Sequence, residues 1–236
     1  MSRRAGYALH VMTASGAVAG LLALQAIIDN NIRGALIWLV VCQVLDGLDG
    51  PIARRIDVVI HAPRVDGFTL DLIVDYLTCV VVPVALLIRL ELLPQEFQTL
   101  IAGLILLMSA LWFARTDIET EDHWFNGFPA AWNLVIPTFI ILGTREDYVI
   151  AMILGLCAIS LTKLKFPHLV KVTFLRPLTW ALAIVYFVAL TLLSTKYPDG
   201  PAYLKPILVL FPICIFGISI FHSWKVRESS VNSSND

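Results

Sequence analysis

The chain has 236 residues, of which 58 % are hydrophobic and 15 % are charged, whereas about a quarter of the residues in soluble domains are charged. Together with a mean hydropathy of +0.80, this composition excludes an ordinary soluble domain and a disordered chain, and it indicates a membrane protein. The net charge is −1 and the basic residues form no stripe, which excludes a nucleic-acid-binding surface.

Eight apolar runs are predicted to be membrane-spanning helices, because about 20 apolar residues cross the hydrocarbon core of a bilayer. In chain order they are Ala5–Ile28, Gly34 to about Ile56, Gly67–Ile88, Phe97–Ala114, Gly127–Thr144, Tyr148–Thr162, Pro177–Thr195 and Pro206–Trp224. The first run is long and further spans follow it, so we expect an uncleaved helix rather than a signal peptide. The fold class predicted is all-α and polytopic, with one domain over residues 1–227 and a polar tail over residues 228–236.

The distribution of basic residues predicts the orientation of these spans. Twelve of the 17 Lys and Arg residues fall in loops on one side, together with both chain ends, and five fall on the other. Because positively charged loops stay in the cytoplasm, we expect both termini to be cytoplasmic in a multi-pass protein of the bacterial inner membrane.

Four aspartates lie at membrane depth in the second and third predicted spans. Asp46 and Asp49 are spaced i, i+3, and Asp71 and Asp75 are spaced i, i+4, so each pair projects from one helical face. One aspartate near the centre of a span costs about 2.5–3.5 kcal/mol on insertion scales, and four would cost on the order of 10 kcal/mol without compensating cations.

Divalent cations are the compensation that these residue types favour. Clustered carboxylates without nearby His or Cys suit Mg²⁺ or Mn²⁺, and two such ions balance four aspartates. Paired ions clamp phosphate oxygens during an in-line displacement, so the pattern predicts phosphoryl transfer. The alternative is a salt-bridge cluster with Arg54 and Arg55, in which neighbouring glycines only permit close helix packing.

The aspartates belong to a longer pattern. It reads Asp46-x2-Asp49-Gly50-x2-Ala53-Arg54, followed after residues 55–66 by Gly67-x3-Asp71-x3-Asp75. This pattern resembles the signature of the CDP-alcohol phosphatidyltransferases, with every fixed position filled. The spacer is longer than in most members and resembles that of the bacterial phosphatidylcholine synthases. Residues 120–129 and Trp132-Asn133 also resemble a loop of those synthases.

The resemblance implies an enzyme that condenses CDP-diacylglycerol with choline to give phosphatidylcholine and CMP, working as a homodimer among membrane lipids. By position, it implies that Asp46, Asp49 and Asp71 hold two Mn²⁺ or Mg²⁺ ions. Asp75 would share in metal binding or accept the proton of the choline hydroxyl. The residues implied to surround the CDP moiety are Asp46, Gly50, Ala53, Arg54 and Gly67.

Two further features suggest binding residues outside the aspartate pattern. Arg115 ends the fourth predicted span and would bind a lipid phosphate by resemblance, or would act only as a topological anchor. The hypothesis for choline rests on a loop cluster of acidic and aromatic residues, because quaternary ammonium ions bind aromatic faces and acids; the alternative is a solvated loop. The residues of that cluster are Glu121, Asp122, His123 and Trp124.

Other basic and imidazole residues receive structural interpretations. The basic loop from Lys163 to Arg176 would attract anionic lipid, but topology alone explains it. His10 is interpreted as a packing or interfacial residue. Rival functions are another CDP-alcohol phosphotransferase, accepting serine, inositol or glycerol phosphate or using CDP-choline as donor, and a cation or proton transporter with intramembrane acids.

Overall fold

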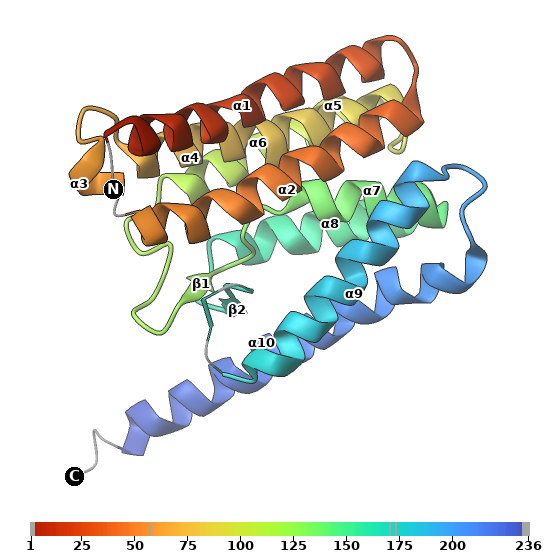
Figure 1. Cartoon of the computed structure of the whole chain (residues 1–236). Helices are drawn as coiled ribbons and strands as arrows, with labels where there is room; N and C mark the ends of the chain where they lie inside the picture. The colour runs from red at the N-terminus through yellow and green to blue at the C-terminus, as the bar shows by residue number, and fades with distance from the viewer. Residues whose placement is uncertain (1–2, 57, 170, 173, 233–236) are drawn as a thin grey trace.

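The computed structural model describes residues 3–56, 58–169, 171–172 and 174–232, and the described part is almost entirely helical (Figure 1). The predicted all-α fold is therefore confirmed. In chain order the elements are α1 (Arg3–Ile28), α2 (Ile32–Ile56), α3 (Val58–His61), α4 (Gly67–Asp75), the π-helical η1 (Tyr76–Val81), α5 (Val82–Arg89), α6 (Gln95–Phe113), β1 (Trp124–Asn126), α7 (Trp132–Leu142), α8 (Glu146–Ser160), β2 (Lys165–Pro167), α9 (Arg176–Thr195), the 3₁₀ turn η2 (Ala202–Leu204) and α10 (Lys205–Asn232).

Six helical segments of the described chain are long and apolar enough to cross a membrane, and each falls where a span was predicted. The third of them joins α4, η1 and α5 into one run from Gly67 to Arg89. The fifth and sixth predicted spans correspond to α7 and α8, with 11 and 15 residues. At 1.5 Å per residue, α7 and α8 are about 16 and 22 Å long, less than the hydrocarbon thickness of about 30 Å.

The shortness of α7 has a local cause. The predicted span began at Gly127, but Gly127 and Ala130 have positive φ angles of 81° and 51°, which no right-handed helix contains. These residues form an irregular segment ahead of Trp132, where α7 begins.

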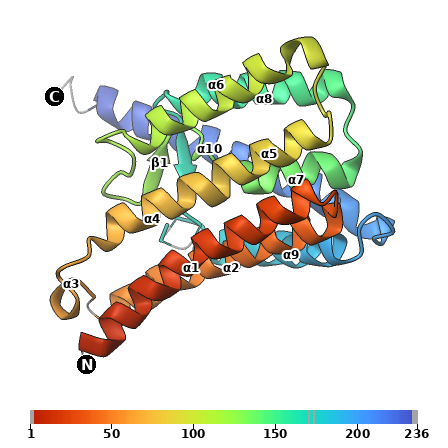
Figure 2. The same cartoon turned by 90° about the horizontal axis from the view of Figure 1, so that it is seen from above.

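The helices form a bundle in which α1 and α2 lie side by side, next to the run α4–η1–α5 (Figures 1 and 2). Helix α9 packs against α2 and against α10, and α6 packs against α8. Side chains from many helices meet in one hydrophobic core, in which Leu36, Ile105, Ile136 and Leu190 are fully buried. At one end α10 runs to Asn232, so residues 228–232 of the predicted tail continue that helix, and residues 233–236 lie outside the described residues.

One end of the bundle gathers the elements that build the site. The start of α1, the end of α2 and the start of α4 lie there, together with a small sheet (Figure 1). In that sheet β1 pairs antiparallel with β2, with Phe125 opposite Phe166. The sheet therefore joins two loops that are about 40 residues apart in sequence, which no local pattern in the chain predicted.

Candidate active site

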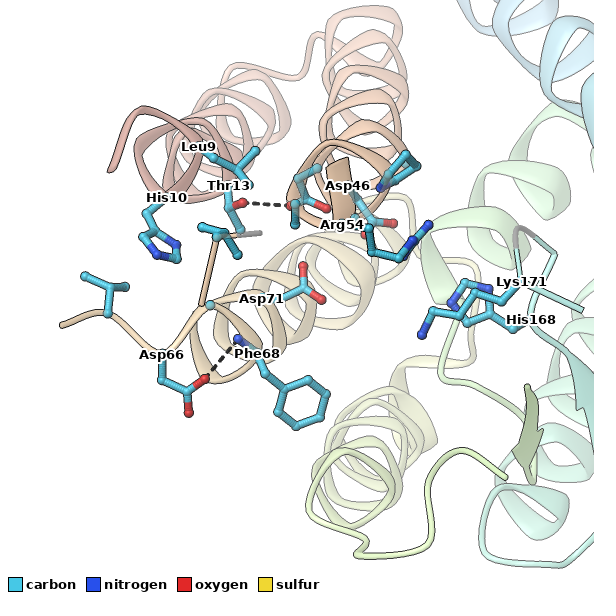
Figure 3. A pocket seen from close by; sticks show the side chains of 18 of the residues that line it. Leu9, His10, Thr13, Asp46, Arg54, Asp66, Phe68, Asp71, His168 and Lys171 are labelled. Carbon is cyan, nitrogen blue, oxygen red and sulfur yellow. Dashed lines mark hydrogen bonds between the residues drawn. The ribbon is translucent and has the colours of Figure 1, made fainter. Parts of the chain in front are cut away.

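Helix α4 begins at a well-defined cap that sets the position of its acidic face. Asp66 is the N-cap, and its carboxylate accepts hydrogen bonds from the backbone N–H groups of Phe68 and Thr69 at 3.1 and 3.4 Å (Figure 3). The Thr69 hydroxyl donates to the same carboxylate at 2.6 Å, and this bond lowers the pKa of Asp66 below its ordinary value. Because the helix starts at Gly67, Asp71 and Asp75 lie one and two turns inside it.

The end of α2 supplies the opposite acidic face. Asp46 is exposed and Asp49 is 7 % exposed, one turn apart on α2. Pro51 lies inside this helix and cannot donate a backbone hydrogen bond to the carbonyl of Gly47. A Cβ added to Gly50 would lie 3.4 Å from a guanidinium nitrogen of Arg54, so the absent side chain leaves room for the arginine to lie beside the aspartates.

The two faces converge. Asp46, Asp49 and Asp71 each offer one carboxylate oxygen, and these three atoms lie within 4.8 Å of one another. The fourth aspartate, Asp75, lies outside this group of three but interacts electrostatically with Asp46 and Asp71. The structure therefore brings the predicted carboxylates from two helices to one place, with Asp75 one turn deeper along α4.

The donor set fits a hard divalent cation. Mg²⁺ binds oxygen ligands at about 2.0–2.1 Å, so neighbouring ligand oxygens around one ion stand about 3 Å apart and opposite ones about 4 Å apart. Oxygens within 4.8 Å of one another need only small side-chain movements to share an ion. The three side chains offer carboxylate oxygen alone, a donor set that favours Mg²⁺ or Mn²⁺ over softer metals.

Helix α1 orients one of these carboxylates. The hydroxyl of Thr13 donates a buried hydrogen bond of 2.9 Å to Oδ2 of Asp49. This bond fixes the orientation of the Asp49 carboxylate, so α1 contributes to the site although its sequence contains no acidic residue.

A cavity of about 600 Å³ opens over the carboxylates, a volume typical of sites for small organic ligands. Its walls come from α1, α2, α4, the spacer and a distant loop. Residues implied to surround CDP line it, namely Gly50, Ala53, Arg54 and Gly67, together with Asp46, Asp49 and Asp71. On the far wall lie His168 and Lys171 (Figure 3).

Arg115 lies elsewhere and has its donors occupied. Its Nε and Nη2 donate to the two oxygens of Asp117, each at 2.8 Å. Its Nη1 reaches the backbone carbonyls of Asn126, Ser160 and Thr162 at 3.0–3.2 Å. The guanidinium joins the end of α6, strand β1 and the end of α8, and it does not line the cavity.

The loop cluster suggested for choline is not brought to the cavity either, since none of Glu121, Asp122, His123 and Trp124 lines it. Trp124 is 1 % exposed and stacks on His222 with ring centroids 3.7 Å apart, so its aromatic face is covered. Asp122 lies 3.6 Å from the same histidine, and Nδ1 of His123 contacts Glu119 at 2.7 Å.

Three cavity residues were missed or discounted in the sequence. Thr13 and His10 belong to an apolar helix, and His10 lines the cavity although it was interpreted as a packing residue. Its Nε2 is buried and has no hydrogen-bond partner among the described residues. Lys171 belongs to the basic loop that was explained by the orientation of the protein in the membrane. In the sequence, only the i, i+3 spacing of His10 and Thr13 indicates that this helix presents a polar face.

Comparisons with known proteins agree with this geometry. No protein-family model matches the chain. A phosphatidylcholine synthase of Pseudomonas aeruginosa is 37 % identical over 198 residues, which cover 84 % of this chain and 83 % of the relative. The chain belongs to the phosphatidylcholine synthase family. Another member, from Borreliella burgdorferi, is 31 % identical over 93 % of this chain and 95 % of its own length. A third, from Rhizobium meliloti, is 33 % identical over 77 % of this chain and 76 % of its own length.

Membership of the phosphatidylcholine synthase family gives the resemblance seen in the sequence a second support. The matched stretches cover most of the chain and most of each relative, so they are too long to consist of the aspartate signature alone. The signature occupies residues 46–75, where the structure places the converging carboxylates.

Proposed function

We propose that this protein transfers the phosphatidyl group of CDP-diacylglycerol to choline, giving phosphatidylcholine and CMP. The observation that carries the proposal is the convergence of Asp46, Asp49 and Asp71 under a cavity of about 600 Å³, in a member of the phosphatidylcholine synthase family. Carboxylates arranged in this way hold cations that grip a diphosphate.

In the proposed reaction the choline oxygen attacks the phosphorus that carries the diacylglycerol, and the bond from that phosphorus to the CMP oxygen breaks. Asp75 accepts the proton of the choline hydroxyl, because a hydroxyl is a weak nucleophile until a base takes its proton. Arg54 donates charge-assisted hydrogen bonds to the nucleotide phosphates. Gly50, Ala53 and Gly67 leave space for the CDP moiety.

Asp46, Asp49 and Asp71 would hold two divalent cations, Mn²⁺ or Mg²⁺, with Thr13 fixing the orientation of the Asp49 carboxylate. These ions would supply neutralisation of the diphosphate charge and stabilisation of the departing CMP. The protein itself mainly positions the two substrates. Arg115 and the loop residues Glu121–Trp124 have no part in the proposal, because none of them lines the cavity.

The test is a reconstituted assay with CDP-diacylglycerol, labelled choline and Mn²⁺ or Mg²⁺. We expect labelled phosphatidylcholine from the wild-type protein, none after chelation by EDTA, and none from Asp71→Asn. The matched control is Asp147→Asn, because the Asp147 side chain is 76 % exposed and pairs with Arg145 outside the cavity. Product formation that persists in excess chelator would contradict the metal-dependent mechanism.

The same assay separates the alternatives by their substrates. If unlabelled serine, inositol or glycerol phosphate is incorporated in place of choline, or if CDP-choline with diacylglycerol is the productive pair, the enzyme is a different CDP-alcohol phosphotransferase. Uptake of labelled choline into sealed vesicles without a lipid product would instead favour a transporter.

We also propose that the protein lies in the bacterial inner membrane with both termini in the cytoplasm, so that CDP-diacylglycerol and choline reach the cavity from the cytoplasmic side. The asymmetry of the basic residues supports this orientation. Protease accessibility of a C-terminal tag in inside-out and right-side-out vesicles tests it. The resemblance also implies a homodimer, which the mass of the purified protein in nanodiscs would reveal.

A further inference from the structure

Two residues on the far wall of the cavity come from a segment that the aspartate signature does not contain. His168 and Lys171 follow β2, about 100 residues after Asp71 in the chain, yet they line the same cavity as the three converging aspartates (Figure 3). Lys171 interacts electrostatically with Asp71 across this space. The five basic or imidazole side chains from Lys163 to Arg176 thus differ, because only these two line the cavity.

The segment that carries Lys171 is held in place by several contacts. Strand β2 pairs with β1, and the backbone N–H of His168 donates to the carbonyl of His123 at 3.2 Å. The imidazole of His168 stacks on Phe125 with ring centroids 5.0 Å apart. The backbone N–H groups of Lys171 and Val172 both donate to the carbonyl of His168, which closes a turn. Lys171 therefore has a fixed place on the wall.

The side chain of Lys171 is also oriented. Its Nζ contacts both carboxylate oxygens of Glu119, at 2.8 and 3.1 Å. Nδ1 of His123 contacts the same carboxylate at 2.7 Å. Glu119 does not line the cavity, so it contacts the ammonium from the side away from the cavity. An ammonium has three donors, and at least one remains for a ligand in the cavity.

Lys171 supplies the ammonium group of this wall. Burial lowers the pKa of its neighbour His168 to about 4, so that imidazole is neutral at pH 7. The acidic lining residues are Asp46, Asp49, Asp66 and Asp71, and the lining lysine and arginine side chains are those of Lys171 and Arg54. Arg54 lies on α2 with two of the aspartates, whereas Lys171 lies on the opposite wall.

We propose that Lys171 binds a phosphate oxygen of the donor's diphosphate from the wall opposite the carboxylates, and that Glu119 positions it for this task. The proposal rests on the proposed function, since it assigns one contact of the CDP-diacylglycerol donor. The donor then lies between cations held by Asp46, Asp49 and Asp71 on one side and the Lys171 ammonium on the other. A lysine serves here as a point charge for phosphate.

The test measures binding of CDP, in the presence of Mn²⁺ and without choline, to the full chain in nanodiscs of zwitterionic lipid. We expect Lys171→Met to weaken CDP binding by about 10- to 100-fold, the loss typical of a hydrogen bond to a charged group. Lys171→Arg should restore the affinity to within about threefold. Lys163→Met is the matched control, because Lys163 is an exposed lysine near β2 that does not line the cavity; its CDP affinity should equal that of the wild type.

A purely structural role for the salt bridge predicts a different result. Glu119→Gln removes the same ion pair but leaves the ammonium in the cavity, so it should weaken CDP binding much less than Lys171→Met. Equal losses in the two variants would overturn the proposal, as would unchanged CDP binding in Lys171→Met. Thermal unfolding checks the fold, and Lys171→Gln provides a second neutral variant if the methionine variant does not reach the nanodisc.

Three remaining outcomes distinguish a lipid contact of Lys171, a failure of the Lys171 contact alone and a failure of the proposed function. If Lys171→Met binds CDP normally but responds differently to phosphatidylglycerol in the nanodisc, Lys171 contacts an anionic lipid headgroup and the donor contact is wrong. If the wild-type protein makes phosphatidylcholine while Lys171→Met binds CDP like the wild type, only this inference fails. If the wild type neither binds CDP nor makes the lipid, the proposed function fails with it.

Discussion

Thr13 offers the sharpest test of how the carboxylates are organised, because its hydroxyl bonds to one of the carboxylates that we propose to bind a metal ion. The Thr13 hydroxyl donates to Oδ2 of Asp49 at 2.9 Å, and Asp49 is 7 % exposed. In Thr13→Val a methyl group replaces the hydroxyl at similar volume, so Oδ2 stays buried without its donor. Such a loss at a charged acceptor costs about 1.5–3 kcal/mol.

Part of this cost falls on metal binding, because the carboxylate is then free to rotate away from the geometry that a cation needs. Residues that orient a ligating group contribute about 10- to 100-fold to metal affinity. We therefore expect Thr13→Val to weaken Mn²⁺ binding by that factor, whereas Thr13→Ser, which keeps the hydroxyl, retains most of the affinity.

The assay is a titration of the purified protein with Mn²⁺, in which the free ion is followed by electron paramagnetic resonance without any substrate present. Thr191→Val is the control, since the Thr191 hydroxyl donates to the carbonyl of Phe187 within α9 and lies away from the cavity. If Thr13→Val and the wild type bind Mn²⁺ with the same affinity, the contact does not organise the site and the reasoning is refuted.

Three further predictions concern the framework around the site. Gly127→Ala should destabilise the protein by about 3 kcal/mol or more in thermal unfolding, because φ is +81° and a Cβ would lie 1.9 Å from the carbonyl oxygen of Ser160. The control is Gly103→Ala. Gly103 lies on α6, where a Cβ would meet open space, so this change should stabilise the protein by about 0.5–1 kcal/mol. Arg115→Lys should cost about 2 kcal/mol or more, because an ammonium cannot reach Asp117 and three carbonyls together, and unchanged unfolding would contradict the clamp. The hydrogen bond from Arg115 lowers the pKa of Asp117 below its ordinary value of 3.8. The stabilisation is therefore present above that value and is lost as the pH falls through the lowered one, so the difference in melting temperature between the wild type and Asp117→Asn should shrink at acid pH.

The fold was predictable where the signal is local. The runs of apolar residues located every long helix, since the length needed to cross a membrane is fixed by the rise per residue. The irregular segment before α7 was not predicted. Hydropathy does not register that Gly127 and Ala130 adopt positive φ angles, and Gly127 does so where the backbone approaches Ser160.

The hypotheses for Arg115 and Trp124 could not take account of contacts between residues that are distant in sequence. Arg115 had the position of a phosphate ligand, but its donors meet carbonyls up to 47 residues away. Trp124 had the chemistry of a choline-binding aromatic ring, but His222, almost 100 residues later, covers its face. The burial of a side chain and its contacts with distant segments cannot be read from its neighbours in sequence.

The sequence by itself determined that the chain is a membrane protein, because its apolar runs are long enough to span a bilayer. It also determined that the two aspartates of each pair lie on one face of their helix, because helical periodicity fixes which side chains share a face. The tertiary structure alone decided that the pairs converge, that Thr13 holds Asp49 and that Lys171 closes the opposite wall. These are contacts between residues 22 to about 100 positions apart in sequence, and their geometry follows from how the helices pack rather than from the order of the residues.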